Sequence, residues 1–290
     1  MRIEAALTQA DIARARSVPN TALILADARL GALQVMNSYA TRYIMPIVAT
    51  AIGKSPREIL LSALYTRALA YGQTASELRS AIHFQSLLAA SRSVLELCID
   101  MELIHKTLVP DAVPKVYAHV NGQKLRAARR LVEFSSKYPS LKAANTVVDQ
   151  IRYIATDGTA IEAGWKAYWP QFPQHWSALG LPQRSELCGD DTKVLLSNVY
   201  DMQNFAVHSS VTGVLGFKPE HHTGMAALGI EVIGKCLVAG TKIISPEMKI
   251  DCVLVDFEQD MKLLDDVIAL TFIDAKLRTL GDAPHVVVHT

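Results

Sequence analysis

The stretch LLAASRSVLELCIDMELI, residues 87–104, decides the fold. Its apolar side chains recur every three or four residues and cover most of the circumference of a helix, and neither Gly nor Pro interrupts them. A helix that is apolar on nearly all sides has to be covered by other helices. We therefore expect a long, buried helix over about residues 75–109, with Thr74 and Glu77 as its capping box.

Apolar residues follow helical spacing through nearly the whole chain, and Pro and Gly fall between the runs. The pattern predicts an all-α protein: a single bundle-like domain of about eight to ten helices over 1–280, followed by a C-terminal tail at 281–290. The stretch 169–189 is expected to be an irregular connection anchored by Trp169 and Trp176. A basic helix is expected after Pro114 and ends near residue 138. The other expected helices cover about 3–18, 21–52 with a kink at Pro46, 56–70, 139–157, 159–168, 191–209, 224–244 and 246–280.

The composition restricts the partners of the protein. The net charge is only +1 over 290 residues, so no overall field attracts nucleic acid or an anionic membrane. The most membrane-like stretch, 225–244, carries three charged residues, so we predict a core helix and no membrane partner. Half of the residues are hydrophobic and 20% are charged, which favours a homodimer. The beginning of the chain resembles no signal or transit peptide, which predicts a cytoplasmic protein.

Two lines of polar side chains mark helices that are otherwise apolar. Residues four apart share one helix face, so each line is a narrow polar stripe. If the stripes face each other, they form a connected polar network in a low dielectric, and such networks shift pKa values and mark sites. The alternative is a satisfied polar core that fixes helix register. The first line holds Arg92, Glu96 and Asp100, and the second holds Tyr200, Asn204 and His208.

Other motifs carry weaker signals. Glu102 and His105 have the Glu-x-x-His spacing of di-iron bundles, but the sequence holds no second copy of it. Residues 229–236 have phosphate-loop spacing, yet they lie in an expected helix and Cys236 replaces the required hydroxyl. The four cysteines lack zinc-ligand spacing, and no cofactor or metal is expected.

The basic helix that ends near residue 138 is interpreted as a solvated face rather than a nucleic-acid patch, with Arg129 paired to Glu133. His221 and His222, adjacent on a turn, are interpreted as loop residues.

Three separated motifs resemble an uncharacterised bacterial family of all-helical proteins, of the type called domain of unknown function 5677. They are the run from Arg92 to Glu96, the triplet His175-Trp176-Ser177, and Tyr200 followed by His208, and the resemblance spans about residues 80–213. There is a weaker analogy to HEPN-like domains, helical nucleotide-binding domains that include metal-independent ribonucleases. These pair an Arg with a His about four to six residues apart on one helix, a motif absent here.

The resemblance and the polar lines together predict a metal-independent, ribonuclease-like or nucleotide-handling enzyme of a defence or stress system. His208 is the expected general acid or base, and Arg92, Glu96 and Tyr200 complete the catalytic group. The alternative is a non-enzymatic helical binding or assembly module, and a metal site at Glu102 and His105 ranks third. RNA or a nucleotide is the expected partner, with Asn204, Trp176 and His175 as substrate-binding residues.

Overall fold

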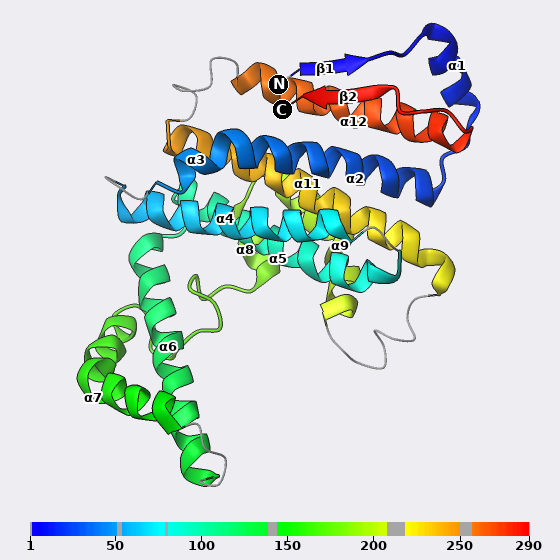
Figure 1. The fold of residues 1–290 in the computed structure, drawn as a ribbon. Helices are drawn as coiled ribbons and strands as arrows, with labels where there is room; N and C mark the ends of the chain where they lie inside the picture. Colours follow the sequence, from blue (N-terminus) through cyan, green and yellow to red (C-terminus); the bar gives the residue numbers. More distant parts are fainter. Residues whose placement is uncertain are drawn as a thin grey trace. The chain divides into compact units, whose positions relative to one another are not determined.

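The computed structural model describes residues 2–50, 54–78, 81–138, 144–207, 218–249 and 257–289 (Figure 1). Most of these residues lie in helices, and two short strands form a small sheet. The prediction of an all-α protein is confirmed. Among the described residues, no helix combines the length and the apolar character needed to cross a membrane.

The chain divides into two compact units. The large unit comprises Met1–His105 and Cys188–Thr290, and the inserted unit comprises Lys106–Leu187. The helices of the large unit are α1 (Gln9–Ser17), α2 (Ala22–Tyr39), α3 (Met45–Val48), α4 (Pro56–Glu77), α5 (Phe84–His105), α9 (Asp190–Val207), α11 (His222–Glu247) and α12 (Phe257–Thr279), with a π-helical turn at Ala40–Ile44 and 3₁₀ turns at Ala81–His83 and Pro219–His221. Those of the inserted unit are α6 (Ala112–Lys137), α7 (Ala144–Lys166) and α8 (Leu181–Leu187).

Helix α5 is the centre of the large unit, as the sequence predicted. It packs against α4, α9 and α11, and its leucine and isoleucine side chains are almost completely buried, except for the half-buried Leu97. Gly229 lets α11 approach closely, because a Cβ atom at that position would lie 3.1 Å from the carbonyl group of Leu87. The phosphate-loop spacing at 229–236 therefore lies inside a continuous helix and serves packing.

Two of the predicted helix starts are confirmed, and their caps explain why. The hydroxyl of Thr21 accepts a hydrogen bond from the backbone N–H of Ile24, and Ser55 forms a capping box with Glu58 ahead of Pro56 at the first helical position. The irregularity predicted near Pro46 is a π-helical turn that ends immediately before Met45. Such turns accommodate the hydrogen bond that a proline cannot donate.

Two predicted boundaries are wrong because capping residues occur inside helices. Thr74 does not begin a helix; α4 continues to Glu77, and the Thr74 hydroxyl donates to the carbonyl of Ala70. Ser245 and Pro246 do not begin the last helix either, since α11 continues to Glu247. A serine or threonine hydroxyl that bonds back to its own helix is indistinguishable in sequence from a cap.

The two chain ends pair with each other, which differs from the predicted helix at 3–18 and tail at 281–290. β1 (Arg2–Ala5) and β2 (Val286–His289) run antiparallel, with Ile3 opposite Val288. The run of valines in β2 has β-branched side chains that favour a strand. α1 begins only at Gln9, behind a capping box formed by Thr8 and Asp11.

The inserted unit is built on the packing of α6 against α7. α7 passes through Gly158 without a break, so the two helices predicted at 139–157 and 159–168 form one. The connection after α7 folds back onto α6, where the ring of Phe172 lies so close to Gly122 that no Cβ atom would fit. Trp169 and Trp176 are buried, as expected of anchors, although the short helix α8 interrupts the predicted irregular stretch.

Candidate functional site

The two predicted polar lines meet within the large unit at Arg92 and Tyr200. Nε of Arg92 donates to Oε1 of Glu96 at 3.0 Å, and the guanidinium carbon lies 5.5 Å from the centre of the Tyr200 ring. The Nη1 atom of Arg92 is buried and has no hydrogen-bond partner among the described residues. Asn204 is half-buried on α9, the helix of Tyr200, and His208 lies outside the described residues. The arrangement holds a cation between α5 and α9.

The two remaining expected substrate-binding residues, His175 and Trp176, belong to the inserted unit. Nε2 of His175 accepts from the Arg184 guanidinium at 2.9 Å, since a guanidinium N–H can only donate. Nδ1 of His175 lies 2.8 Å from the hydroxyl of Ser177. His119 contacts the same connection at the carbonyl of Pro173, and burial lowers the pKa of His119. These contacts hold the connection in one conformation.

Glu102 and His105 turn in different directions, so their spacing does not indicate a shared metal site. The buried carboxylate of Glu102 accepts from the N–H of Gly189 at 2.9 Å and from the hydroxyl of Thr192 at 2.8 Å, which anchors the start of α9. His105 instead contacts Glu247, which also accepts from Arg57 at 2.6 Å. Within the described residues, no group of three or more His, Cys, Asp or Glu side chains is arranged to hold a metal ion.

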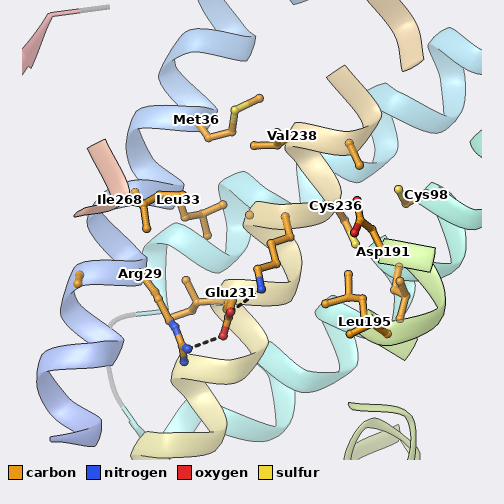
Figure 2. A pocket seen from close by; sticks show the side chains of 18 of the residues that line it. Arg29, Leu33, Met36, Cys98, Asp191, Leu195, Glu231, Cys236, Val238 and Ile268 are labelled. Atoms are coloured by element: carbon orange, nitrogen blue, oxygen red, sulfur yellow. Dashed lines mark ion pairs between the residues drawn. The ribbon is translucent and has the colours of Figure 1, made fainter. Parts of the chain in front are cut away.

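A pocket of about 800 Å³ lies among α2, α5, α9, α11 and α12 of the large unit (Figure 2). Most of its wall is apolar, and the side chains in Figure 2 come from several helices that surround the space. This volume falls within the usual range for small-molecule sites, about 300–1,000 Å³. Representative apolar residues of the wall are Leu33, Met36, Leu95, Leu195, Ile230 and Phe272.

One wall of the pocket is charged. Glu231 of α11 forms an ion pair with Arg29 of α2 and a second with Lys235 one turn further along α11, with an N–O distance of 2.7 Å to Lys235 (Figure 2). The Arg29 and Glu231 side chains are about one-quarter exposed, whereas Lys235 extends into solvent. Asp191 and Lys242 complete the charged groups of the lining, which therefore holds three cations and two carboxylates.

The pocket also contains two thiols, those of Cys98 on α5 and Cys236 on α11. Both residues are buried, and the hydrogen bond with Cys98 together with burial raises the pKa of the Cys236 thiol. A raised pKa keeps the thiol protonated at neutral pH, and the thiolate is the reactive form. Cys236 thus contributes a soft, apolar wall rather than a nucleophile.

Sequence reasoning missed the pocket because small residues create it. Ala28 and Ala32 lie one turn apart on α2, and Gly234 lies on the facing side of α11. A Cβ atom at Gly234 would meet no atom within 4 Å, so this glycine leaves space that no neighbour fills. A stripe of small residues on two helices was the available signal, but it equally indicates close helix packing.

Comparison with known proteins gives no relative: no protein-family model matches the chain, and neither the curated proteins nor the solved structures contain a match.

Proposed function

We propose that the protein is a helical binding module whose large unit holds an apolar small molecule with one anionic group. The observation that carries this proposal is the pocket of about 800 Å³ with an apolar wall and a cluster of charges on one side. Apolar side chains with a few placed polar groups are what small-molecule sites typically present. This is the non-enzymatic alternative of the sequence analysis, with a ligand class added.

The charges of the wall favour an anion over a cation. Glu231 is already paired with Arg29 and Lys235, and Lys242 adds a third cation. A positively charged ligand group would therefore compete with these cations for the Glu231 carboxylate. An incoming carboxylate or sulfonate can accept hydrogen bonds from Lys235, which keeps donors toward solvent. The apolar remainder of such a ligand then lies against Leu33, Leu195 and their neighbours, where burial contributes about 25 cal/mol per Å².

Isothermal titration calorimetry with dodecanoate and dodecylamine tests the ligand class, because the two probes share a chain and differ in charge. We expect dodecanoate to bind at least tenfold more tightly. Substitution of Gly234 by Leu should weaken binding, because the new side chain occupies part of the pocket without displacing backbone. Gly164→Leu is the matched control in the inserted unit, where the glycine is equally unobstructed. Equal binding by wild type and Gly234→Leu would overturn the proposal.

A second candidate function is the metal-independent, ribonuclease-like or nucleotide-handling enzyme of a defence or stress system. The buried Nη1 atom of Arg92, which lacks a hydrogen-bond partner among the described residues, supports it, because such a donor can stabilise a developing negative charge. Cleavage of RNA in the presence of a chelator should be lost in Arg92→Ala and in His208→Ala, with melting temperatures near that of wild type. Undiminished cleavage in both variants, or none in wild type, contradicts the enzyme.

A further inference from the structure

The two units differ in charge, although the whole chain is nearly neutral. Residues 106–187 contain eleven Lys and Arg against six Asp and Glu, a net charge of +5, and the remaining residues contain eighteen against twenty-two, a net charge of −4. Helix α6 alone contains six cations and one carboxylate, also +5. The positive charge of the inserted unit therefore corresponds to the excess on one helix.

Several cations of α6 project into solvent. Arg129 is exposed as well, but it pairs with Glu162 of α7 at 2.8 Å rather than with the predicted Glu133. Lys124 and Arg130 are exposed, and neither has an ion-pair partner in the part of the chain that the structure describes. Exposed cations that form no ion pair are available to an anionic partner.

Exposed aromatic rings lie among these cations. Arg126, Arg130, Phe134 and Lys137 are four, four and three residues apart and share one side of α6, opposite the buried Leu125. Phe134 is 50% exposed, and its ring centre lies 4.9 Å from that of Tyr138, which is 41% exposed. The ammonium group of Lys137 lies 5.5 Å from the centre of the Tyr138 ring. We call residues 124, 126, 130, 134, 137 and 138 the α6 basic face.

We propose that the α6 basic face binds single-stranded nucleic acid, a role independent of the pocket in the large unit. From Lys124 to Lys137 the helix rises about 20 Å, so its cations can contact several consecutive phosphates. Unpaired bases have open faces that stack on exposed aromatic rings, and this stacking is sequence-tolerant. A duplex hides those base faces and gains only the phosphate contacts.

The distribution of side chains distinguishes this partner from an anionic membrane. A helix that lies on a membrane carries its apolar residues on one side and its cations on the other. In α6 the apolar side, with Gly122 and Leu125, is already buried within the inserted unit, and Phe134 and Tyr138 lie among the cations. Alternation of cations and aromatic rings on one exposed side is the arrangement of a surface that tracks a backbone and stacks bases.

Fluorescence anisotropy with labelled dT20 and U20 oligonucleotides tests the proposal and separates DNA from RNA. Lys124→Glu/Arg130→Glu should weaken binding of the preferred oligonucleotide at least tenfold and reduce the slope of log K against log salt by about 1.4, for two lost phosphate contacts. Arg16→Glu/Lys262→Glu is the matched control, with the same change in net charge at two exposed residues of the large unit. It should change affinity less than twofold.

A second pair of measurements tests stacking. Phe134→Ala/Tyr138→Ala should weaken binding of the single strand about tenfold and leave binding of a 20-base-pair duplex nearly unchanged. The proposal is overturned if the wild type binds neither dT20 nor U20, or if the charge reversal behaves like its control. It is also overturned if the protein binds phosphatidylserine vesicles but no oligonucleotide. A charge reversal that only dissociates a dimer, measured by light scattering, would assign the face to a second copy instead.

Discussion

Helix α5 of the large unit buries Leu87, Leu88 and Ile104 on different sides, whereas α6 of the inserted unit buries Leu125 and otherwise nothing larger than valine. The charged groups near the two helices differ in burial as well. At the end of α5, His105 contacts a partly buried ion pair between Arg57, at the start of α4, and Glu247, at the end of α11, while the cations of α6 face solvent. A helix that depends on burial is sensitive to side-chain volume, and a helix that presents charge tolerates truncation but not charge reversal.

The largest expected effect is at the centre of the large unit. Leu87 is fully buried, so Leu87→Ala should lower the free energy of unfolding by about 3–4 kcal/mol through lost burial and a cavity. Val120→Ala removes an apolar side chain that is 42% exposed on α6, and should lower it by less than about 0.5 kcal/mol. Urea denaturation followed by circular dichroism measures both. Similar losses in the two variants would remove the contrast between the units.

Replacing a glycine by alanine should change the free energy of unfolding in opposite directions in the two units. At Gly229 the added methyl group meets the backbone of Leu87 at 3.1 Å, and a backbone cannot rotate away as a side chain does. Gly229→Ala should therefore destabilise the protein by about 1–3 kcal/mol. At Gly164 of α7 the methyl group meets nothing, so Gly164→Ala should stabilise by about 0.5–1 kcal/mol because helix propensity improves. Thermal melting of the two variants and wild type measures these changes, and melting temperatures that shift in the same direction would contradict the prediction.

The smallest expected effects concern carboxylates and their pH dependence. Burial raises the pKa of Glu247, but hydrogen bonds from Arg57 and His105 outweigh burial and lower that pKa below its ordinary value. A carboxyl group with a lowered folded pKa stabilises the fold above its unfolded pKa, about 4.3, and loses that contribution as pH falls through the folded pKa. Glu247→Gln should therefore cost about 1–2 kcal/mol at pH 7, and less as the pH falls below 4.

Glu162 of the inserted unit is the surface counterpart of Glu247. Hydrogen bonds from Lys166 and Arg129 lower its pKa to about 2, and its side chain, at 30% exposed, is twice as exposed as that of Glu247 at 15%. Solvent and salt screen such a pair, so Glu162→Gln should leave the melting temperature unchanged within about 1 °C at 0.15 M salt. If Glu162→Gln lowers the melting temperature as much as Glu247→Gln does, the exposure of a carboxylate does not determine its contribution to stability.

The sequence predicts the helical class and the central helix because both follow from periodicity within a window of about 20 residues. The helix starts near 21 and at 56 were predicted for the same reason, since the caps Thr21 and Ser55 involve only the next three residues. Glu102 shows the limit. Its partners lie at Gly189 and Thr192, and no local pattern links residues that are nearly ninety positions apart. A spacing typical of a metal motif was instead an anchor for another helix.

The pairing of β1 with β2 and the pocket escaped prediction for related reasons. A strand of four residues has too few positions to show alternation, and its partner lies at the other end of the chain. The pocket depends on absent side chains, such as those missing at Gly234 and Ala32, and an absence has no periodicity of its own. The facing of Arg92 and Tyr200 also depends on how α5 and α9 pack. The homodimer, inferred from composition, stays a prediction.

The anchoring of Gly189 and Thr192 by Glu102 has a consequence for how this chain is assembled. Glu102 lies one turn before the end of α5, and the two residues it holds begin the return of the chain to the large unit, as does Cys188, whose thiol lies 4.0 Å from the carbonyl of Ile99. The carboxylate of Glu102 thus joins the two places where the backbone leaves the large unit and enters it again. We therefore expect that residues 106–187 can be removed as a block, with the large unit closed by a short loop.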